Sequence, residues 1–109
     1  MPAAAKSQGK SDVECPHGTF NPLTGDCSLP LTSKTDEGSS TVFVNGIGAV
    51  RLDDKMAQHN AKNCGPHTPK LVEGSPTVFV NGKKMGRVND KHEDDEVIST
   101  GSGNVFVNG

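Results

Sequence analysis

Tryptophan and tyrosine are absent from this chain of 109 residues, and aromatic residues make up only 4% of it. Hydrophobic residues make up 31%, which is less than a domain of this length normally uses for its core. We therefore expect one domain over residues 1–109, with a thin core that a metal ion or a partner surface helps to stabilise. No apolar run approaches the length of about 18 residues that a membrane span needs, and residues 1–10 lack a signal-peptide pattern, so we expect a chain made in the cytoplasm.

An excess of basic residues is also missing. The chain has 11 basic and 13 acidic residues, mixed along its length, and a net charge of −2. This balance and the scarcity of aromatic rings argue against binding to nucleic acid. The 3 cysteines are an odd number, which excludes a complete set of disulfides. In a reducing compartment, cysteine close to histidine more often indicates a metal site or a free thiol, and we expect Cys27, which has no histidine nearby, to be a free thiol.

What the sequence does contain is a repeated strand. Residues 38–46, 74–82 and 101–109 each end in Val-Phe-Val-Asn-Gly. Asn-Gly between two extended runs predicts a β-hairpin, because both residues of such a turn adopt positive φ. The first two copies continue through mostly small residues to an arginine, which predicts a short return strand. Residues 1–6 have the same character and end in lysine, so we expect this N-terminal segment to supply the return strand of the third copy.

Alternation along each Val-Phe-Val segment places phenylalanine on one face and the two valines on the other. We infer that three equivalent side chains fill a shared centre; the sequence leaves open which face points inward. Arg51 and Arg87 hold matched positions in the first two copies, and ion pairs with Asp54 and Asp90 account for them. The sequence therefore predicts an all-β fold: a small conical, three-sided structure of short hairpins with pseudo-threefold symmetry and little or no helix.

Three polar loops, at residues 7–37, 54–73 and 90–100, connect the repeats and contain all 4 histidines. If the hairpins share an axis, these loops meet at one end of it. Imidazole and thiol groups gathered at one point are typical of a tetrahedral zinc site. We therefore expect a metal-bound apex, with zinc as the ion and iron as the alternative. The expected ligands are His17, His59, His67 and His92.

The fourth ligand stays open, because Cys64 and Cys15 are alternatives to His92. A site closed by four protein ligands is structural, and its binding free energy becomes folding free energy. We do not expect an enzyme, since no histidine-orienting group or oxyanion element accompanies any cysteine. The acidic run at residues 93–96 lacks the alternating ligands of a calcium loop, and we interpret it as a solvated turn.

Gly-Ser-Pro-Thr-Val-Phe-Val-Asn-Gly (74–82), followed by small residues and Arg-Val-Asn-Asp (87–90), resembles the PAAR-repeat family (proline-alanine-alanine-arginine). The resemblance covers nearly the whole chain and includes the opening Met-Pro-Ala-Ala, although the namesake tetrapeptide is degenerate here. Proteins of this family are conical β structures that cap the trimeric β-helical spike of contractile injection machines, in phage tails or type VI secretion systems. The resemblance implies an apical zinc held by three histidines and one cysteine, and it carries over to His17, His59 and His67. The family's third-loop cysteine corresponds here to Asp94.

The resemblance implies a structural protein that caps and sharpens the spike, one copy per trimer, and is otherwise a monomer. The resemblance also implies that the tip contacts the target envelope transiently and helps to pierce it. Strand edges of the repeats are expected to pair with the open edges of the trimer. The expected partner-binding residues are Val42, Phe43, Val44, Val78, Phe79, Val80, Val105, Phe106 and Val107.

Because the chain ends with the third repeat, we expect no effector domain. This favours a phage tail tip, located in the virion and assembled in the bacterial cytoplasm. The alternatives are the spike tip of a type VI secretion system, which would be secreted, and a metal-dependent hydrolase that acts on the envelope. Closed coordination by four protein ligands supports the structural role, whereas three ligands and a water would support hydrolysis.

Overall fold

The computed structural model describes residues 1–108, so Gly109, the last residue of the third repeat, lies outside the described residues. The chain is all-β, as predicted, and the helical content of this part is one 3-10 turn. In chain order the elements are β1 (Asp12–Asn21), β2 (Asp26–Lys34), β3 (Phe43–Val44), β4 (Ile47–Gly48), β5 (His59–Asn60), β6 (Pro66–His67), β7 (Phe79–Val80), β8 (Lys83–Lys84), β9 (Lys91–His92), η1 (Glu93–Asp95) and β10 (Glu96–Ile98). Strands β2-β1-β10-β9 form one antiparallel sheet, and the other strands form two-stranded hairpins.

The Asn-Gly turns close hairpins in the first two repeats. Strand β3 pairs with β4 and β7 pairs with β8, both antiparallel. At the turns, Asn45 and Gly46 have φ of 52° and 79°, and Asn81 and Gly82 have φ of 54° and 78°. Positive φ at both central residues is the signature of the tight hairpin turn that Asn-Gly favours.

The N-terminal segment completes the third hairpin, which confirms the prediction made from residues 1–6. Ala3 bridges Phe106, and the backbone N–H of Ala4 donates to the carbonyl of Val105 at 2.9 Å. The matching bonds in the other repeats run from Ala49 to Val42 and from Met85 to Val78, both at 3.0 Å. The third repeat thus has the same backbone pairing as the other two, although its partner strand comes from the opposite end of the chain.

The inner faces of the three hairpins form one buried cluster on the pseudo-threefold axis. It consists of equivalent valines and equivalent return-strand residues: Val44, Val80, Val107, Ala4, Ala49 and Met85. The three phenylalanines of the repeats point the other way and remain more than half exposed. The structure therefore decides the question that alternation left open: valine is inside and phenylalanine is outside.

A ring of side-chain hydrogen bonds joins the repeats to one another. Each repeat has a buried serine whose hydroxyl accepts bonds from two backbone N–H groups of its own turn. The same hydroxyl donates to an asparagine of the next repeat. The donations are Ser39 to Asn81 Oδ1 (2.7 Å), Ser75 to the Asn108 carbonyl (2.6 Å) and Ser102 to Asn45 Oδ1 (2.6 Å). The bonds run from the first repeat to the second, from the second to the third and from the third to the first. They therefore close a cycle, as a threefold arrangement requires.

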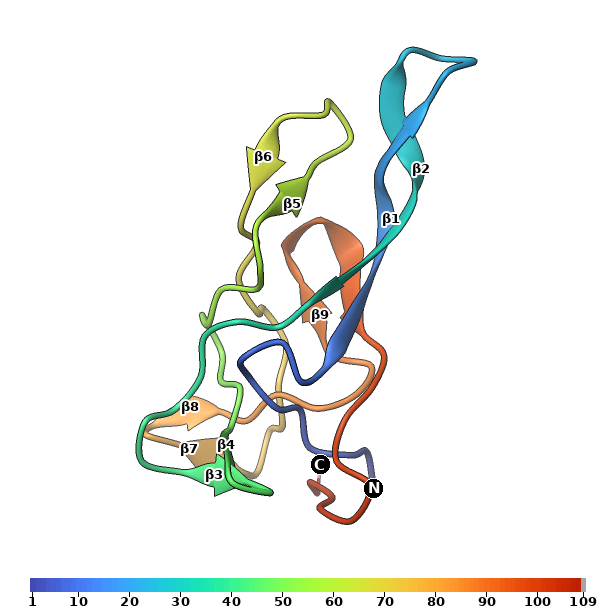
Figure 1. Ribbon diagram of the computed structural model, residues 1–109. Coiled ribbons are helices and arrows are strands. Elements are labelled where there is room, and N and C mark those ends of the chain that lie inside the picture. Colours follow the sequence, from blue (N-terminus) through green and yellow to red (C-terminus); the bar gives the residue numbers. More distant parts are fainter. Residues whose placement is uncertain (109) are drawn as a thin grey trace.

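The molecule is elongated along this axis, with extents of 43 × 23 × 22 Å. Figure 1 shows β3, β4, β7, β8 and both termini at one end, which we call the base, and the β1–β2 and β5–β6 hairpins reaching toward the other end. Segment 7–37, expected as an irregular loop, instead contains the longest hairpin of the chain, β1–β2. The prediction was wrong because buried and exposed residues alternate only in the first half of β1, and the outer part of the hairpin lacks the continuous apolar alternation by which a strand is recognised.

A second buried cluster lies between the base and the two hairpins. It contains Ala5, Val13, Cys15, Val50, Met56, Leu71 and Ile98. Beside it, the expected ion pairs are present: Arg51 Nη2 lies 3.0 Å from Asp54 Oδ1, and Arg87 Nη2 lies 3.0 Å from Asp90 Oδ1. No helix within residues 1–108 is long and apolar enough to cross a membrane.

Cys27 of β2 and Cys64, between β5 and β6, form a disulfide across a separation of 37 residues. This corrects two expectations, that Cys27 is a free thiol and that Cys64 is available to a metal. The odd number of cysteines excluded only a complete pairing and was no evidence against one bond. The disulfide ties the β1–β2 hairpin to the β5–β6 hairpin, which positions the side chains described next.

Candidate metal centre

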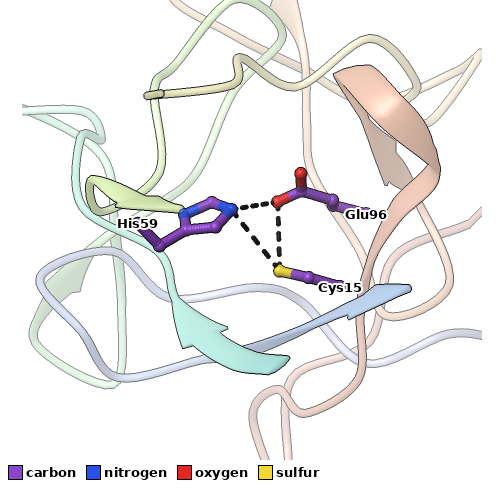
Figure 2. Close-up of side chains that lie close together, drawn as sticks. All are labelled: Cys15, His59 and Glu96. Carbon is purple, nitrogen blue, oxygen red and sulfur yellow. Dashed lines mark hydrogen bonds and ion pairs between the residues drawn. The ribbon is translucent and has the colours of Figure 1, made fainter. Parts of the chain in front are cut away.

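Side chains from three separate segments of the chain meet beneath the β1–β2 and β5–β6 hairpins. Cys15 comes from β1, His59 from β5 and Glu96 from β10, and the three point toward one another (Figure 2). Cys15 Sγ lies 3.0 Å from Glu96 Oε1 and 3.6 Å from His59 Nε2, and His59 Nε2 lies 2.5 Å from Glu96 Oε1. Each polar segment that connects the repeats thus contributes one ligand atom, as convergence on a shared axis predicts.

His67 of β6 extends this group. It faces His59 across the β5–β6 pair, with the two Nε2 atoms 2.9 Å apart. Its Nε2 also lies 3.1 Å from Glu96 Oε2, and its Nδ1 lies 3.3 Å from Asp94 Oδ2. Two overlapping sets of side chains can therefore hold a metal ion: Cys15 with His59 and Glu96, and His67 with Asp94 and Glu96.

The hydrogen bonds fix the tautomer of His59. Its Nδ1 lies 2.8 Å from the carbonyl of Ala57, which can only accept a hydrogen bond, so Nδ1 carries the proton. In a neutral ring Nε2 then presents a lone pair to the Glu96 carboxylate and to Nε2 of His67. Because the Nε2 lone pair of His59 and the Glu96 carboxylate are both acceptors, a proton or a metal cation must lie between them. Orientation of a ligating histidine by a backbone carbonyl is the usual arrangement around protein-bound metals.

Glu96 is the most unusual member of the group, because its carboxylate is fully buried, with 0% exposure. Both oxygens face the cluster: Oε1 faces His59 and Cys15, and Oε2 faces His67, where it accepts no well-aligned hydrogen bond. Burying an ionised carboxylate is costly unless a positive charge compensates for it. A divalent cation bound by Cys15, His59 and Glu96, with His67 beside Oε2 of Glu96, would provide that charge.

Three donor atoms, from Cys15, His59 and Glu96, lie close enough together to bind one ion. Bonds of about 2.0 to 2.3 Å from zinc to nitrogen, oxygen and sulfur place tetrahedral ligand atoms roughly 3.3 to 3.6 Å apart. The separation of 3.6 Å from Cys15 to His59 agrees with this value, whereas those of 3.0 Å from Cys15 to Glu96 and 2.5 Å from His59 to Glu96 are shorter. Binding an ion would therefore require the Glu96 carboxylate to move away from the other two donors, by up to about 1 Å from His59.

Burial and nearby carboxylates raise the pKa of the Cys15 thiol far above its ordinary value: desolvation comes first, followed by the hydrogen bond to and the charge of Glu96. Without a cation this sulfur is therefore a thiol that donates to Glu96. A bound metal reverses that preference, because a coordinating cysteine is deprotonated.

His17 lies at the edge of the cluster. It is two residues after Cys15 in β1, so the two side chains share a face of the strand. Its ring centroid is 6.4 Å from that of His67, and its Nδ1 is buried without a hydrogen-bond partner. A buried ring nitrogen without a partner, close to the other imidazoles, is available to an ion or to a water molecule beside it.

His92, which we expected as the fourth ligand, does not join the others. Its side chain is buried and its Nδ1 lacks a hydrogen-bond partner, but it belongs to neither candidate set. Burial, and to a lesser extent the charge of His59, lower the pKa of His92 to about 4. Two other side chains take the place expected for His92. One is Cys15, which was an alternative from the sequence, and the other is Glu96.

Sequence reasoning missed Glu96 because it belongs to the acidic run interpreted as a solvated turn. The structure divides that run: Glu93, Asp94 and Asp95 form the exposed η1 turn, whereas Glu96 begins β10. Period-two alternation offered a signal, since Glu96 and Ile98 share the buried face of β10. A glutamate in phase with a core isoleucine is not on the solvent face of its strand.

No protein-family model matches the chain, and a search of curated proteins also gives no match. The resemblance to the PAAR-repeat family therefore rests on the motifs alone. The chemistry of the site stands independently of it: sulfur, nitrogen and carboxylate donors, with Cys15 and Glu96 buried, form a set that can bind a metal ion.

Proposed function

We propose that this chain is a structural tip that caps and sharpens the trimeric β-helical spike of a contractile injection machine. The single observation that carries the proposal is the cyclic hydrogen bonding of three equivalent hairpins at the base. A monomer has no internal need for threefold symmetry. A trimeric shaft presents three identical surfaces at its end, and one chain that imitates a trimer can match all three at once.

The exposed side chains of the base support this partner. Phe43, Phe79 and Phe106 hold equivalent positions and are 57%, 55% and 52% exposed. Val42 is also exposed, while Val78 and Val105 are half-buried. Large aromatic side chains are costly to leave in water and are enriched where proteins bind one another. Three of them in symmetric positions indicate one symmetric contact.

Only part of the partner-binding set expected from the sequence is exposed. Val44, Val80 and Val107 are buried in the cluster on the pseudo-threefold axis, so their side chains stabilise the base and are not available to a partner. The phenylalanines beside them provide the contact. Their strands are only two residues long, so strand pairing with the trimer would be short, and the aromatic side chains supply most of the buried apolar surface.

The metal centre has a structural role in this proposal, with zinc as the ion and iron as the alternative. The segments that carry Cys15, His59 and Glu96 share a small core, and an ion that bonds all three holds them in fixed relative positions. The protein is not an enzyme in this proposal, because the role of the ion is to join the separate segments that carry the buried Cys15 and Glu96. A rigid narrow end transmits force when the spike is driven into an envelope.

The proposal is tested by co-purifying the chain with the trimeric β-helical spike of the same organism. We expect one chain per three spike subunits, and we expect the combined changes Phe43→Ser, Phe79→Ser and Phe106→Ser to abolish the complex. The matched control is Leu23→Ser, which removes an exposed apolar side chain from the β1–β2 turn at the opposite end. Binding that survives the triple change, or a stoichiometry of three chains per trimer, would rule out the symmetric contact.

We place the protein at the tail tip of a phage virion, assembled in the bacterial cytoplasm, in preference to the tip of a type VI secretion spike. Both assignments use the same base and the same kind of partner. Which of the two spikes forms the complex with the purified chain distinguishes them.

A further inference from the structure

The turn between β1 and β2 exposes apolar side chains at the end of the molecule opposite the base. Leu23 is 94% exposed, Phe20 is 57% exposed, and Leu29 is 40% exposed on the adjoining strand. Figure 1 shows this turn projecting beyond β5, β6 and β9, far from both termini. Burial of Phe20 and Leu23 in the fold is not possible from this position, so the fold leaves them in water at a cost.

The outer part of this hairpin, residues 15–33, is also depleted of charge. Charged residues make up 22% of the chain, yet residues 15–33 contain a single one, Asp26. The Asp26 carboxylate accepts a hydrogen bond from the Thr24 hydroxyl at 2.5 Å, so part of its polarity is already paired. Exposed segments of soluble proteins normally carry charge, and this hairpin of exposed strands does not.

The backbone of the turn has its N–H groups satisfied internally. Asn21 accepts three of them: Leu23 N–H through Oδ1 at 3.0 Å, and the N–H groups of Thr24 and Gly25 through its carbonyl at 3.2 and 2.8 Å. Pro22 has no N–H to satisfy. Pairing of these N–H groups lowers the cost of moving the turn out of water.

We propose that the β1–β2 turn inserts Phe20 and Leu23 into the surface of a lipid bilayer. The size of the patch favours lipid over a protein partner. Contact through two or three side chains buries on the order of a few hundred Å² of this chain's surface, below the roughly 800 Å² per partner of a standard protein interface. A bilayer surface accepts a few apolar side chains without a complementary shape. The Cys27–Cys64 disulfide holds β2 against the β5–β6 hairpin, so the turn is presented in a fixed position.

The insertion extends the proposed function, because it identifies lipid as the surface that the narrow end meets. In the proposed function the tip only needs to be rigid and narrow, whereas here it also binds lipid. The depth is limited by Asp26, whose charge stays at the level of the headgroups. Since the outer part of the hairpin carries almost no charge, the binding should persist at high salt, unlike adsorption by basic residues.

The experiment exploits the absence of tryptophan and tyrosine from the chain. Leu23→Trp places one fluorophore at the turn, and Phe79→Trp places one at the base, where the native side chain is also more than half exposed. With vesicles of zwitterionic phosphatidylcholine, Leu23→Trp should shift its emission to shorter wavelength and be quenched by brominated acyl chains. Phe79→Trp should show neither effect.

A second measurement uses the otherwise native chain in vesicle flotation. Combined Phe20→Ser and Leu23→Ser changes should lower the vesicle partition coefficient about 10-fold or more, with an unchanged melting temperature because both side chains are exposed. Equal shifts at both tryptophans, no shift at Leu23→Trp, or a concentration-dependent oligomer that these serines dissolve would overturn the proposal. No spike is present in these assays, so their failure leaves the docking of the base untouched, and failed docking leaves lipid insertion untouched.

Discussion

Replacing Glu96 with glutamine removes one negative charge from the metal centre and hardly changes the size of the side chain. The carboxylate is fully buried and contacts three candidate ligands, Cys15, His59 and His67. Solvent therefore cannot take its place as a ligand. The same replacement at His92 provides the matched control, because that side chain is also buried but belongs to neither candidate metal set.

We expect Glu96→Gln to weaken zinc binding by about 100-fold, since a neutral amide replaces an anionic ligand. At 1.4 kcal/mol per factor of ten this is about 3 kcal/mol of binding free energy. A ligand that binds only the folded chain stabilises it in proportion to its affinity, so the free energy of unfolding at saturating zinc should fall by a similar amount. His92→Gln should lower stability through imperfect burial of the amide, while zinc affinity stays within a few-fold of native.

The assays are elemental analysis of the purified proteins, zinc titration against a competing chelator, and chemical denaturation with and without chelator. The decisive quantity is the difference that chelator makes to each protein: large for the native chain and His92→Gln, and small for Glu96→Gln. The reverse order, with metal lost from His92→Gln and kept by Glu96→Gln, would falsify the ligand set proposed from the structure. If chelator does not change the denaturation of the native protein, the ion has no structural role.

Three further predictions concern stability. Changing Cys27 and Cys64 together to serine should cost about 4 kcal/mol, the loop-closure value for a separation of 37 residues; denaturation midpoints equal to those of the native chain would contradict it, and reductant should reproduce the loss. Ser75→Ala removes one donated and two accepted hydrogen bonds at a buried site and should cost about 2 to 3 kcal/mol, whereas exposed Ser40→Ala should change little; similar midpoints for both would mean that the ring contributes nothing. In metal-free protein, His92 keeps a pKa of about 4 while the unfolded chain takes up its proton near 6.5, so stability should fall as pH decreases through this window, by about 3 kcal/mol in all; an NMR titration of the ring that gives an ordinary pKa would refute this.

The hairpins of the base were predictable because their causes are local. Asn-Gly at residues 45–46 and 81–82 specifies the turn through positive φ, whatever the rest of the chain does. Repetition then predicted that a third partner strand was required, and the small residues before Lys6 indicated where it is. Local chemistry and internal repetition are both visible in one sequence.

The hairpin at β1–β2, the Cys27–Cys64 bond and the role of Glu96 were not predictable in the same way. Each depends on segments distant in the chain being placed side by side, and neither spacing nor composition measures that placement. His92 and Glu96 illustrate the limit: they pair directly across β9 and β10, yet only Glu96 joins the candidate ligands. Four residues of separation gave no basis for choosing between them.

By itself, then, the sequence determined a three-part β structure with hairpin turns at fixed positions and metal-binding residue types in each connecting segment, because turn geometry and alternation are properties of neighbouring residues. The tertiary structure alone decided that valine faces inward and phenylalanine outward, that two cysteines bond across the narrow end, and that a buried glutamate joins cysteine and histidine. These outcomes depend on which side chains exclude water from one another, and that is settled only when the whole chain is packed.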